Sequence, residues 1–433
     1  MDSVLRVSNG GTFTGSILVP GDKSISHRAI MLGALSDGLT RVTGCLLSED
    51  VMCTINAFRL LGVHVDLNTS SDEVLVHGVG LYGLKNSPQP IYVGNSGTSM
   101  RLMAGIFSGA GLSISMTGDS SLSSRPMRRI CEPLVQMGAN LKTSSEGTAP
   151  LYIGANNGLK GITYAMPVAS AQVKSCILLA GLYADTPTKV IERIPTRDHT
   201  ETMFETFGVS LVLEAGSITL SPAQKPIACD VVVPADISSA TFFLVGGAIG
   251  LDSRISMKGV GVNKTRSGII RILEMMNAKI SVTNVRMCGG EKVADITVAS
   301  SDLHGVEIPL DCVAAAIDEF PAIFIAAACA KGVTVLRGAT ELRHKESDRI
   351  EVMASGLRTL GVDLETYEDG IKIVGGCIGP GTVDAQGDHR VAMAFSIAAL
   401  KASGNIDISN AEGISTSFPE FVSIAKSVGL RVE

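Results

Sequence analysis

Six segments of the chain share one hydrophobic pattern, in which a few polar residues precede an apolar, small-residue run of helical length. Their leading residues are Asp22, Asn95, Ser170, Asp236, Asp318 and Asp388. Such residues are frequent N-caps of helices, and a unit that recurs at a regular interval indicates an internal repeat. The pattern therefore predicts six buried helices, one in each of six repeats.

A second motif recurs in step with the first. It consists of a hydrophobic pair, then a glycine or asparagine, then a predicted strand in which apolar and polar residues alternate. The pivot residues are Gly62, Gly138, Gly208, Asn277, Gly361 and Gly429. A helix that ends in a left-handed residue selects glycine, with asparagine as its substitute. Each repeat, about 70 residues long, is therefore expected to be an α/β unit.

Six repeats divide naturally into two lobes of three. The crossing is expected near VVVPADISS, where residues 231–233 are predicted to form a strand and Asp236 to open the fourth helix. The N-terminal strand is compatible with either lobe, and we assign it to the second. The expected lobes are residues 22–234, and residues 1–21 together with 235–433.

Composition narrows the functional class. The net charge of −6 disfavours nucleic-acid and membrane-surface partners. The apolar runs are shorter than the roughly 18 residues of a membrane span, and MDSVLRV has no signal-peptide pattern. Nine cysteines form no CxxC pair and have no histidine at zinc-finger spacing. We therefore expect a cytoplasmic protein with reduced thiols and no metal site.

The first two turns of the predicted helices carry cations, among them Lys23, Arg28, Arg101 and Arg390. N-capping explains the polar residues at these openings but not the cations, which oppose the helix dipole. Anions bind at helix N-termini. Several basic openings together therefore predict an anion site between the lobes.

Two nucleotide-binding motifs can be excluded. In PGDKSISHR, Asp22 separates Gly21 from Lys23, whereas a P-loop needs glycine and lysine in contact. GVGLYG matches the dinucleotide glycine pattern, but the following LKNSPQP cannot open a helix. We interpret both segments as unrelated to nucleotide binding.

Residues 343–353, RHKESDRIEVM, form the strongest charged cluster. If this segment is helical, Lys345 and Arg349 are i,i+4 neighbours with Glu346 beside them. The alternative is an ordinary solvated helix face. Pro321 suits the first turn of a helix, which leaves Asp318 just outside it and facing a cleft.

Two further arginines have plain alternatives. Arg125 lies in SSRPMRR, which is also compatible with a basic surface loop. Arg197 lies in PTRDHTE, where residues 198–201 can equally form a capping box.

PGDKSISHR, GNSGTSMR, SRPM, SAQVKSC, DEFPA, KESDR and GDHR, in this order, resemble the signature set of the 5-enolpyruvylshikimate-3-phosphate synthase family. The resemblance implies an α/β fold, a two-lobed inside-out α/β barrel of six βαβαββ repeats with three in each lobe. It also implies transfer of the enolpyruvyl group of phosphoenolpyruvate to the 5-hydroxyl of shikimate 3-phosphate, by addition and elimination, without a metal or cofactor. The active site is then expected in the cleft between the lobes of a monomer that closes on its ligands.

The resemblance also implies the site residues. Shikimate 3-phosphate is expected to contact Lys23, Ser24, Arg28, Ser170, Ala171, Gln172, Arg197, Asp318 and Lys345. Phosphoenolpyruvate is expected to contact Lys23, Asn95, Gly97, Arg125, Gln172, Arg349 and Arg390. Arginine suits these substrates because its planar fork matches phosphate and carboxylate groups.

The resemblance further implies catalytic roles. Two carboxylates from different repeats suit an acid and a base, because their surroundings can separate their pKa values. Asp318 is expected to accept the hydroxyl proton and Glu346 to protonate the methylene carbon. Lys23 is expected to stabilise charge at the bridging oxygen, and the catalytic role of His389 is expected to be either orienting neighbouring groups or a minor part in proton transfer.

The chain departs from one branch of the family at Thr416 and Ala171, which stand where that branch has lysine and serine. No phosphate-binding lysine is therefore expected at position 416. Gly97 leaves room beside phosphoenolpyruvate, so we expect sensitivity to the inhibitor glyphosate.

Two rival functions remain open from the sequence. A sister transferase uses UDP-N-acetylglucosamine and a reactive loop cysteine, for which Cys131 in a predicted helix is a poor match. A non-catalytic polyanion-binding scaffold would keep the cations without needing the carboxylates Asp318 and Glu346.

Overall fold

The computed structural model describes residues 4–68 and 70–433. The chain forms two compact units. The N-terminal unit comprises Gly21–Val233 and the short segment Cys288–Gly290. The C-terminal unit comprises Met1–Pro20, Pro234–Met287 and Glu291–Glu433. Within the described residues, every helix is too short or too polar to cross a bilayer.

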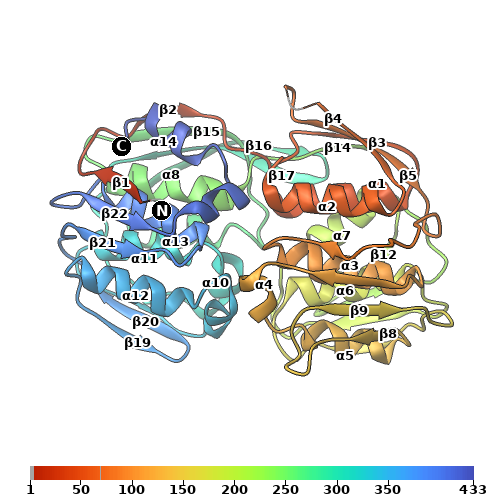
Figure 1. Cartoon of the computed structure of the whole chain (residues 1–433). Coiled ribbons are helices and arrows are strands. Elements are labelled where there is room, and N and C mark those ends of the chain that lie inside the picture. Colours follow the sequence, from red (N-terminus) through yellow and green to blue (C-terminus); the bar gives the residue numbers. More distant parts are fainter. Residues whose placement is uncertain (1–3, 69) are drawn as a thin grey trace. The chain divides into compact units, whose positions relative to one another are not determined.

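The N-terminal unit contains seven helices and three four-stranded sheets among its described residues (Figure 1). Its helices are α1 (Lys23–Leu35), α2 (Glu49–Leu60), α3 (Gly97–Gly109), α4 (Ser120–Ser124), α5 (Arg128–Gln136), α6 (Ala171–Gly181) and α7 (His199–Thr206). Its first sheet is ordered β14 (Asp230–Val232), β3 (Asp37–Thr43), β5 (Glu73–Val79) and β4 (His64–Asn68). The second is β6 (Ile91–Tyr92), β7 (Ile114–Thr117), β9 (Leu151–Gly154) and β8 (Asn140–Lys142). The third is β10 (Thr163–Ala165), β11 (Thr188–Ile191), β13 (Ser217–Leu220) and β12 (Leu211–Glu214).

The C-terminal unit is built from the same parts. Its α-helices are α8 (Ile237–Ile249), α9 (Gly268–Met275), α10 (Leu310–Val313), α11 (Phe320–Cys329), α12 (Arg349–Thr359), α13 (His389–Ala398) and α14 (Phe421–Ser427). Short 3-10 turns are η1 (Ala314–Ala316), η2 (Thr340–His344) and η3 (Glu412–Thr416). One sheet is ordered β16 (Lys279–Cys288), β17 (Glu291–Ala299), β15 (Arg254–Gly261) and β2 (Thr14–Ile17). The others are β18 (Val333–Leu336), β20 (Gly370–Val374) and β19 (Leu364–Tyr367), and β21 (Gly381–Asp384), β22 (Ile406–Ser409), β1 (Leu5–Ser8) and β23 (Arg431–Val432).

The sheets repeat one pairing scheme. In the second sheet, β6 runs parallel to β7, while β9 is antiparallel to both β7 and β8. The third sheet follows the same scheme with β10, β11, β13 and β12. The parallel first pair is joined through a helix, as a parallel pair requires. The six-fold α/β repeat expected from the sequence is thus present.

Three of the repeats obtain a strand from a distant part of the chain. β14 pairs in parallel with β3 and so completes the first repeat from about 190 residues further along. β2 pairs in parallel with β15. β1 lies between β22 and β23 and is antiparallel to both. The two N-terminal strands therefore belong to the sheets of the C-terminal unit.

The first helix of each repeat is buried inside its own unit. In the C-terminal unit, α8, α11 and α13 pack against one another, and every residue of α8 is buried. In the N-terminal unit, α3 packs against both α1 and α6. A helix that is apolar all round needs such complete cover. The second helix of each repeat, such as α2 or α12, keeps an exposed face.

All six pivot residues adopt the left-handed conformation. Their φ angles are 93° at Gly62, 100° at Gly138, 74° at Gly208, 70° at Asn277, 80° at Gly361 and 109° at Gly429. Each follows a helix, namely α2, α5, α7, α9, α12 or α14, and precedes a strand. The predicted helix ends are confirmed, including the single asparagine.

Candidate functional site

Each unit gathers polar residues at the N-terminal ends of its buried helices, and the two groups are described separately. In the N-terminal unit, four cations form what we call the basic cluster, namely Lys23, Arg28, Arg101 and Arg125. In the C-terminal unit, five residues form what we call the Arg349 cluster, namely Asp318, Lys345, Glu346, Arg349 and Asp388. Ion pairs among its own members hold the Arg349 cluster together, whereas hydrogen bonds and an ion pair to neighbouring residues hold the basic cluster in place.

The start of α1 positions Lys23 and Arg28. Asp22 caps the helix by accepting a hydrogen bond from the Ile25 amide at 2.9 Å. Lys23 Nζ lies 2.8 Å from Asp50 Oδ2. Arg28 is buried and donates to the Ser24 carbonyl oxygen at 2.9 Å. Because both cations project from the first two turns, the helix N-terminus and the side chains present positive charge together.

Arg28 also ties α1 to the third repeat. Its Nε donates to Thr200 Oγ1 and its Nη2 donates to Ser175 Oγ, both at 2.8 Å. Ser175 lies in α6 and Thr200 in α7. Two hydroxyls from the third repeat therefore fix the position of the guanidinium.

The start of α3 is built differently from the sequence-based expectation. Ser96, rather than Asn95, caps the helix and accepts from the Ser99 amide. Asn95 precedes the cap, and its side-chain oxygen accepts from Arg125 Nη2 at 2.5 Å. Its amide nitrogen donates to Asp119 Oδ2 at 2.7 Å. The role that the structure supports for Asn95 is thus to orient Arg125.

Space around Gly97 is limited at this helix start. A Cβ at this position would lie 3.0 Å from Arg101 Nη1 and 3.4 Å from Arg125 Nη1. A side chain here would therefore require the Arg101 guanidinium to shift by a few tenths of an ångström.

The start of α6 contributes Gln172 to the same cluster. Ser170 caps the helix, and Ala171 is its first residue. The side-chain oxygen of Gln172 accepts from Arg101 Nη1 at 2.5 Å, and its amide nitrogen donates to Thr98 Oγ1 at 3.2 Å. Gln172 therefore connects α6 to α3 at two points.

His27 is a buried histidine whose pKa is affected by two cations of the basic cluster. The ring is fully buried, and its Nδ1 lies 2.8 Å from Thr54 Oγ1. Burial lowers the pKa of His27 well below its ordinary value, and the charges of Lys23 and Arg28 lower it further. A neutral imidazole beside two cations leaves their positive potential intact.

Lys174 is a residue that the sequence analysis did not single out. Its side chain is 1% exposed, and Nζ lies 3.0 Å from Glu192 Oε2 and 2.6 Å from Glu201 Oε1. The same ammonium donates to the Thr196 carbonyl oxygen. These bonds fix the segment that leads to Arg197, which is itself partly exposed. A buried lysine has to find such partners, but nothing local in SAQVKSC identifies them.

In the C-terminal unit, Asp318 receives two cations. Its Oδ1 lies 3.1 Å from Lys345 Nζ and 3.2 Å from Arg349 Nη1. The helix α11 begins at Phe320 with Pro321 in its first turn, so Asp318 precedes the helix as expected. Its carbonyl oxygen also accepts from Arg390 Nη1 at 3.0 Å.

Arg349 is the centre of its cluster. The guanidinium is 1% exposed and contacts Asp388 Oδ2 at 2.8 Å and Glu346 Oε2 at 2.6 Å, besides Asp318. Burial by itself would lower the pKa of Arg349, but the charges of Asp388, Glu346 and Asp318 outweigh it and raise the pKa above its ordinary value. One cation thus joins the two carboxylates expected to act in catalysis.

Residues 343–353 do not form one helix, so the condition on which the sequence analysis paired Lys345 with Arg349 is not met. A 3-10 turn covers Thr340–His344, and α12 begins only at Arg349, with Asp348 as its cap. Asp348 Oδ1 accepts from the Glu351 amide at 3.1 Å, which stops the helix from extending backwards. Lys345 and Arg349 are therefore not helical i,i+4 neighbours, yet both reach Asp318.

The α13 start supplies the remaining predicted residues. Asp388 caps the helix and accepts from the Arg390 amide at 2.9 Å. His389 is the first helical residue and is 3% exposed. Arg390 Nη1 also lies 3.7 Å from Glu319 Oε1.

Arg266 and Ser238 are further polar residues that the sequence analysis did not identify. Arg266 Nη2 donates to Asp236 Oδ1 at 3.0 Å and to Ser238 Oγ at 2.6 Å. Ser238 in turn donates to Glu319. The α8 start is thereby joined to the residues around Asp318. Asp236 could be recognised from the sequence as a helix cap. Its partner Arg266 could not, because it lies 30 residues away along the chain.

Cys131 and Thr416 are the residues at which the sequence was compared with a sister transferase and with one branch of the family. Cys131 is buried in α5, and burial raises the pKa of its thiol to about 12. Because the thiolate is the reactive form, this is not the setting of an activated cysteine. Thr416 donates to the Gly413 carbonyl oxygen at 2.7 Å within the η3 turn.

Comparison with known proteins places this architecture in one family. The family model described as EPSP synthase (3-phosphoshikimate 1-carboxyvinyltransferase) matches residues 7–424. A 3-phosphoshikimate 1-carboxyvinyltransferase of Methylococcus capsulatus is 52% identical, covering 100% of this chain and 99% of that protein. One of Nitrosococcus oceani is also 52% identical, covering 98% of this chain and 96% of the relative.

Solved structures agree with this result. An EPSP synthase from Acinetobacter baumannii superposes with a TM-score of 0.88 at 48% identity, covering 100% of this chain and 99% of its own. The enolpyruvyl transferase NikO from Streptomyces tendae has a TM-score of 0.80 at 16% identity, with the same coverage, and shares the fold. The chain therefore belongs to the EPSP synthase family.

Proposed function

We propose that this protein transfers the enolpyruvyl group of phosphoenolpyruvate to the 5-hydroxyl of shikimate 3-phosphate and releases phosphate. The observation that carries the proposal is the pairing of full-length family membership with two intact clusters, one basic and one that combines cations with carboxylates. Both substrates are polyanions, and both clusters lie at helix N-termini where anions are favoured. We further propose that the enzyme acts in the cytoplasm as a monomer.

The basic cluster suits the binding of anionic substrate groups. Arg28 is held in place by the hydroxyls of Thr200 and Ser175, so its planar guanidinium is oriented for a phosphate or carboxylate. Arg125 is oriented by Asn95 and Ser121 in the same way. We assign shikimate 3-phosphate to Lys23, Ser24, Arg28, Ser170, Ala171, Gln172, Arg197, Asp318 and Lys345. We assign phosphoenolpyruvate to Lys23, Asn95, Gly97, Arg125, Gln172, Arg349 and Arg390.

The addition step needs two proton movements. The 5-hydroxyl oxygen attacks C2 of phosphoenolpyruvate while its proton passes to Asp318, and Glu346 delivers a proton to the C3 methylene. The product is a tetrahedral intermediate that still carries the phosphate. Arg349 contacts both carboxylates and so fixes their orientation, which is the preorganisation that acid and base catalysis requires.

The elimination step reverses one of those movements. Glu346, now ionised, takes a proton back from the new methyl group, the C–O bond to phosphate breaks, and the enol ether forms as phosphate departs. Lys23 stabilises the charge that develops on the bridging oxygen. His389, buried at the start of α13, orients its neighbours.

The test is phosphate release from phosphoenolpyruvate and shikimate 3-phosphate, with chelator present, in the wild type and in Asp318→Ala. Loss of one preorganised group typically lowers kcat by about 10²–10³, and we expect at least this loss. Asp302→Ala is the matched control, because Asp302 is an exposed carboxylate that also pairs with a lysine, Lys331. It should keep wild-type turnover.

Two results would contradict the proposal. The first is a wild-type protein that releases phosphate with UDP-N-acetylglucosamine but not with shikimate 3-phosphate. The second is a folded Asp318→Ala variant within tenfold of the wild type, which would remove Asp318 from the chemistry. Substrate binding without turnover on either acceptor would favour the non-catalytic scaffold.

A further inference from the structure

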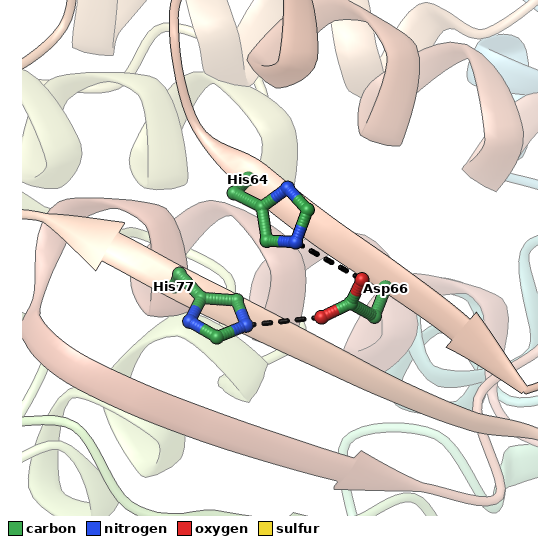
Figure 2. A group of neighbouring side chains, drawn as sticks. All are labelled: His64, Asp66 and His77. Atoms are coloured by element: carbon green, nitrogen blue, oxygen red, sulfur yellow. Dashed lines mark hydrogen bonds and ion pairs between the residues drawn. The ribbon is translucent and has the colours of Figure 1, made fainter.

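Two histidines and an aspartate meet on the exposed face of the first sheet (Figure 2). β4 and β5 are antiparallel, and His64 is the direct partner of His77 in their register. Asp66 lies two residues beyond His64, so the three side chains project from the same face. The intervening residues Val65 and Val76 point into the core and are 3% and 0% exposed.

The three side chains point at one another through atoms that can bind a metal. His64 Nε2 lies 3.0 Å from Asp66 Oδ1, and His77 Nε2 lies 3.0 Å from Asp66 Oδ2. The three donor atoms are all within 4.8 Å of one another. In a tetrahedral zinc site with bonds of about 2.0–2.2 Å, ligand atoms lie about 3.3–3.5 Å apart. The observed spacing needs only small rotations to reach that geometry.

The cluster is open to solvent and has no role in the proposed reaction. The side chains of His64, Asp66 and His77 are 70%, 51% and 47% exposed. An ionised carboxylate and two neutral imidazoles are the forms in which these residues bind metals.

The backbone supports these side chains firmly. β5 is an inner strand of the sheet that pairs with β3 over its full length and with β4 over residues 73–77, which include His77. The rings of His64 and His77 lie with their centroids 4.9 Å apart. A pair held in this way on adjacent strands is already close to the bound arrangement, so little ordering accompanies binding.

We propose that His64, Asp66 and His77 form a surface site for a divalent transition-metal ion, with Zn²⁺ as the representative ion. Two imidazoles and one carboxylate suit zinc, nickel and copper, whereas Mg²⁺ and Ca²⁺ prefer sets of oxygen ligands. The metal enters between the three donor atoms and displaces the two hydrogen bonds to Asp66. Each imidazole then keeps its proton on Nδ1, and water completes the coordination.

The test is titration calorimetry with ZnCl₂ on full-length, tag-free, chelator-treated protein without substrates. The background is Cys377→Ser, because Cys377 is an exposed thiol that would bind zinc by itself. We expect one Zn²⁺ per chain and no comparable binding of MgCl₂. His77→Gln should weaken zinc binding by at least about tenfold, since even loss of a group behind a ligand has an effect of this size.

The matched control is His304→Gln, which removes an exposed histidine from the C-terminal unit. It should leave zinc affinity unchanged, and circular dichroism should show that both variants are folded. Zinc should also raise the Tm of the wild type but not that of His77→Gln. Equal affinities in His77→Gln and His304→Gln would overturn the proposal, as would the absence of stoichiometric zinc binding. Neither result bears on enolpyruvyl transfer, because no substrate is present.

Discussion

At the scale of single residues, Arg349 is tightly constrained by its surroundings. Its guanidinium is buried and contacts three carboxylates, of which Asp388 is completely buried. A lysine would keep the charge but could not span these partners, because an ammonium is a point charge without the planar fork of arginine. The residue is therefore both a structural link and, in our proposal, a contact of phosphoenolpyruvate.

We expect Arg349→Lys to lower kcat/KM by about 10²-fold or more, because Asp318 and Glu346 lose their common anchor. The measurement is steady-state phosphate release. Arg358→Lys is the matched control, since Arg358 lies on the same helix, is exposed, and pairs loosely with Glu351 at 3.6 Å. If both lysine variants kept wild-type kcat/KM, Arg349 would have no role in positioning the carboxylates.

At the scale of elements, the positions where helices end could be read from the sequence because they depend on local backbone conformation. Gly361 illustrates this point. Its φ angle is 80°, and a Cβ built on it would meet no atom within 4 Å. The glycine is thus required by conformation and not by space.

We expect Gly361→Ala to lower the free energy of unfolding by about 1–2 kcal/mol, the cost of a left-handed residue with a Cβ. The measurement is urea unfolding. Gly376→Ala is the control, because Gly376 is exposed, has equal space for a Cβ, and does not have a positive φ angle. A loss of the same size in both variants would show that the glycine at the pivot is not conformationally required.

The element that could not be predicted is the segment before α12. Its charges have helical spacing, but Asp348 and Glu351 also form a capping pattern, and the cap determines where the helix starts. Spacing alone cannot choose between these two local solutions. The cations were nevertheless correctly grouped with Asp318, because electrostatic pairing does not require a continuous helix.

Some contacts of the site residues could be predicted from the sequence and others could not, depending on how close the partner lies along the chain. The N-caps Asp22, Ser170 and Asp388 were recognisable because each acts on an amide two or three residues away. The ion pairs of Lys174 with Glu192 and Glu201 were not, because the partners come from other elements of the repeat. Sequence patterns indicate which residues are polar inside the core, while only the fold shows what satisfies them.

At the scale of the whole molecule, the two units differ in which parts of the chain they need to fold. Strands β1 and β2 of the C-terminal unit come from the N-terminal end of the sequence. The buried apolar cluster of the N-terminal unit lies entirely within residues 25–233, and β14 completes its first sheet. The cluster of the C-terminal unit includes Val7, Phe13 and Ile17 from the other end of the sequence. Phe13 stacks on Phe243 with ring centroids 5.8 Å apart.

We therefore expect residues 21–233 to fold as a fragment, whereas residues 234–433 should not. Loss of a buried phenylalanine or isoleucine typically costs about 2–5 kcal/mol, and a domain is stable by only about 5–15 kcal/mol. Removing Val7, Phe13 and Ile17 together, along with the middle strand β1, should therefore cost more free energy than the folding stability of the C-terminal unit.

The measurement is cooperative thermal unfolding of each fragment by circular dichroism. A third fragment, in which residues 4–20 follow Glu433 through a glycine-serine linker, is the control for the missing strands. This joint is short because the Glu433 amide already donates to the Arg6 carbonyl oxygen at 3.0 Å. We expect the joined fragment to unfold cooperatively and residues 234–433 alone to show no transition. Equal transitions in both would mean that the C-terminal helices determine their own packing and that β1 and β2 only cover it.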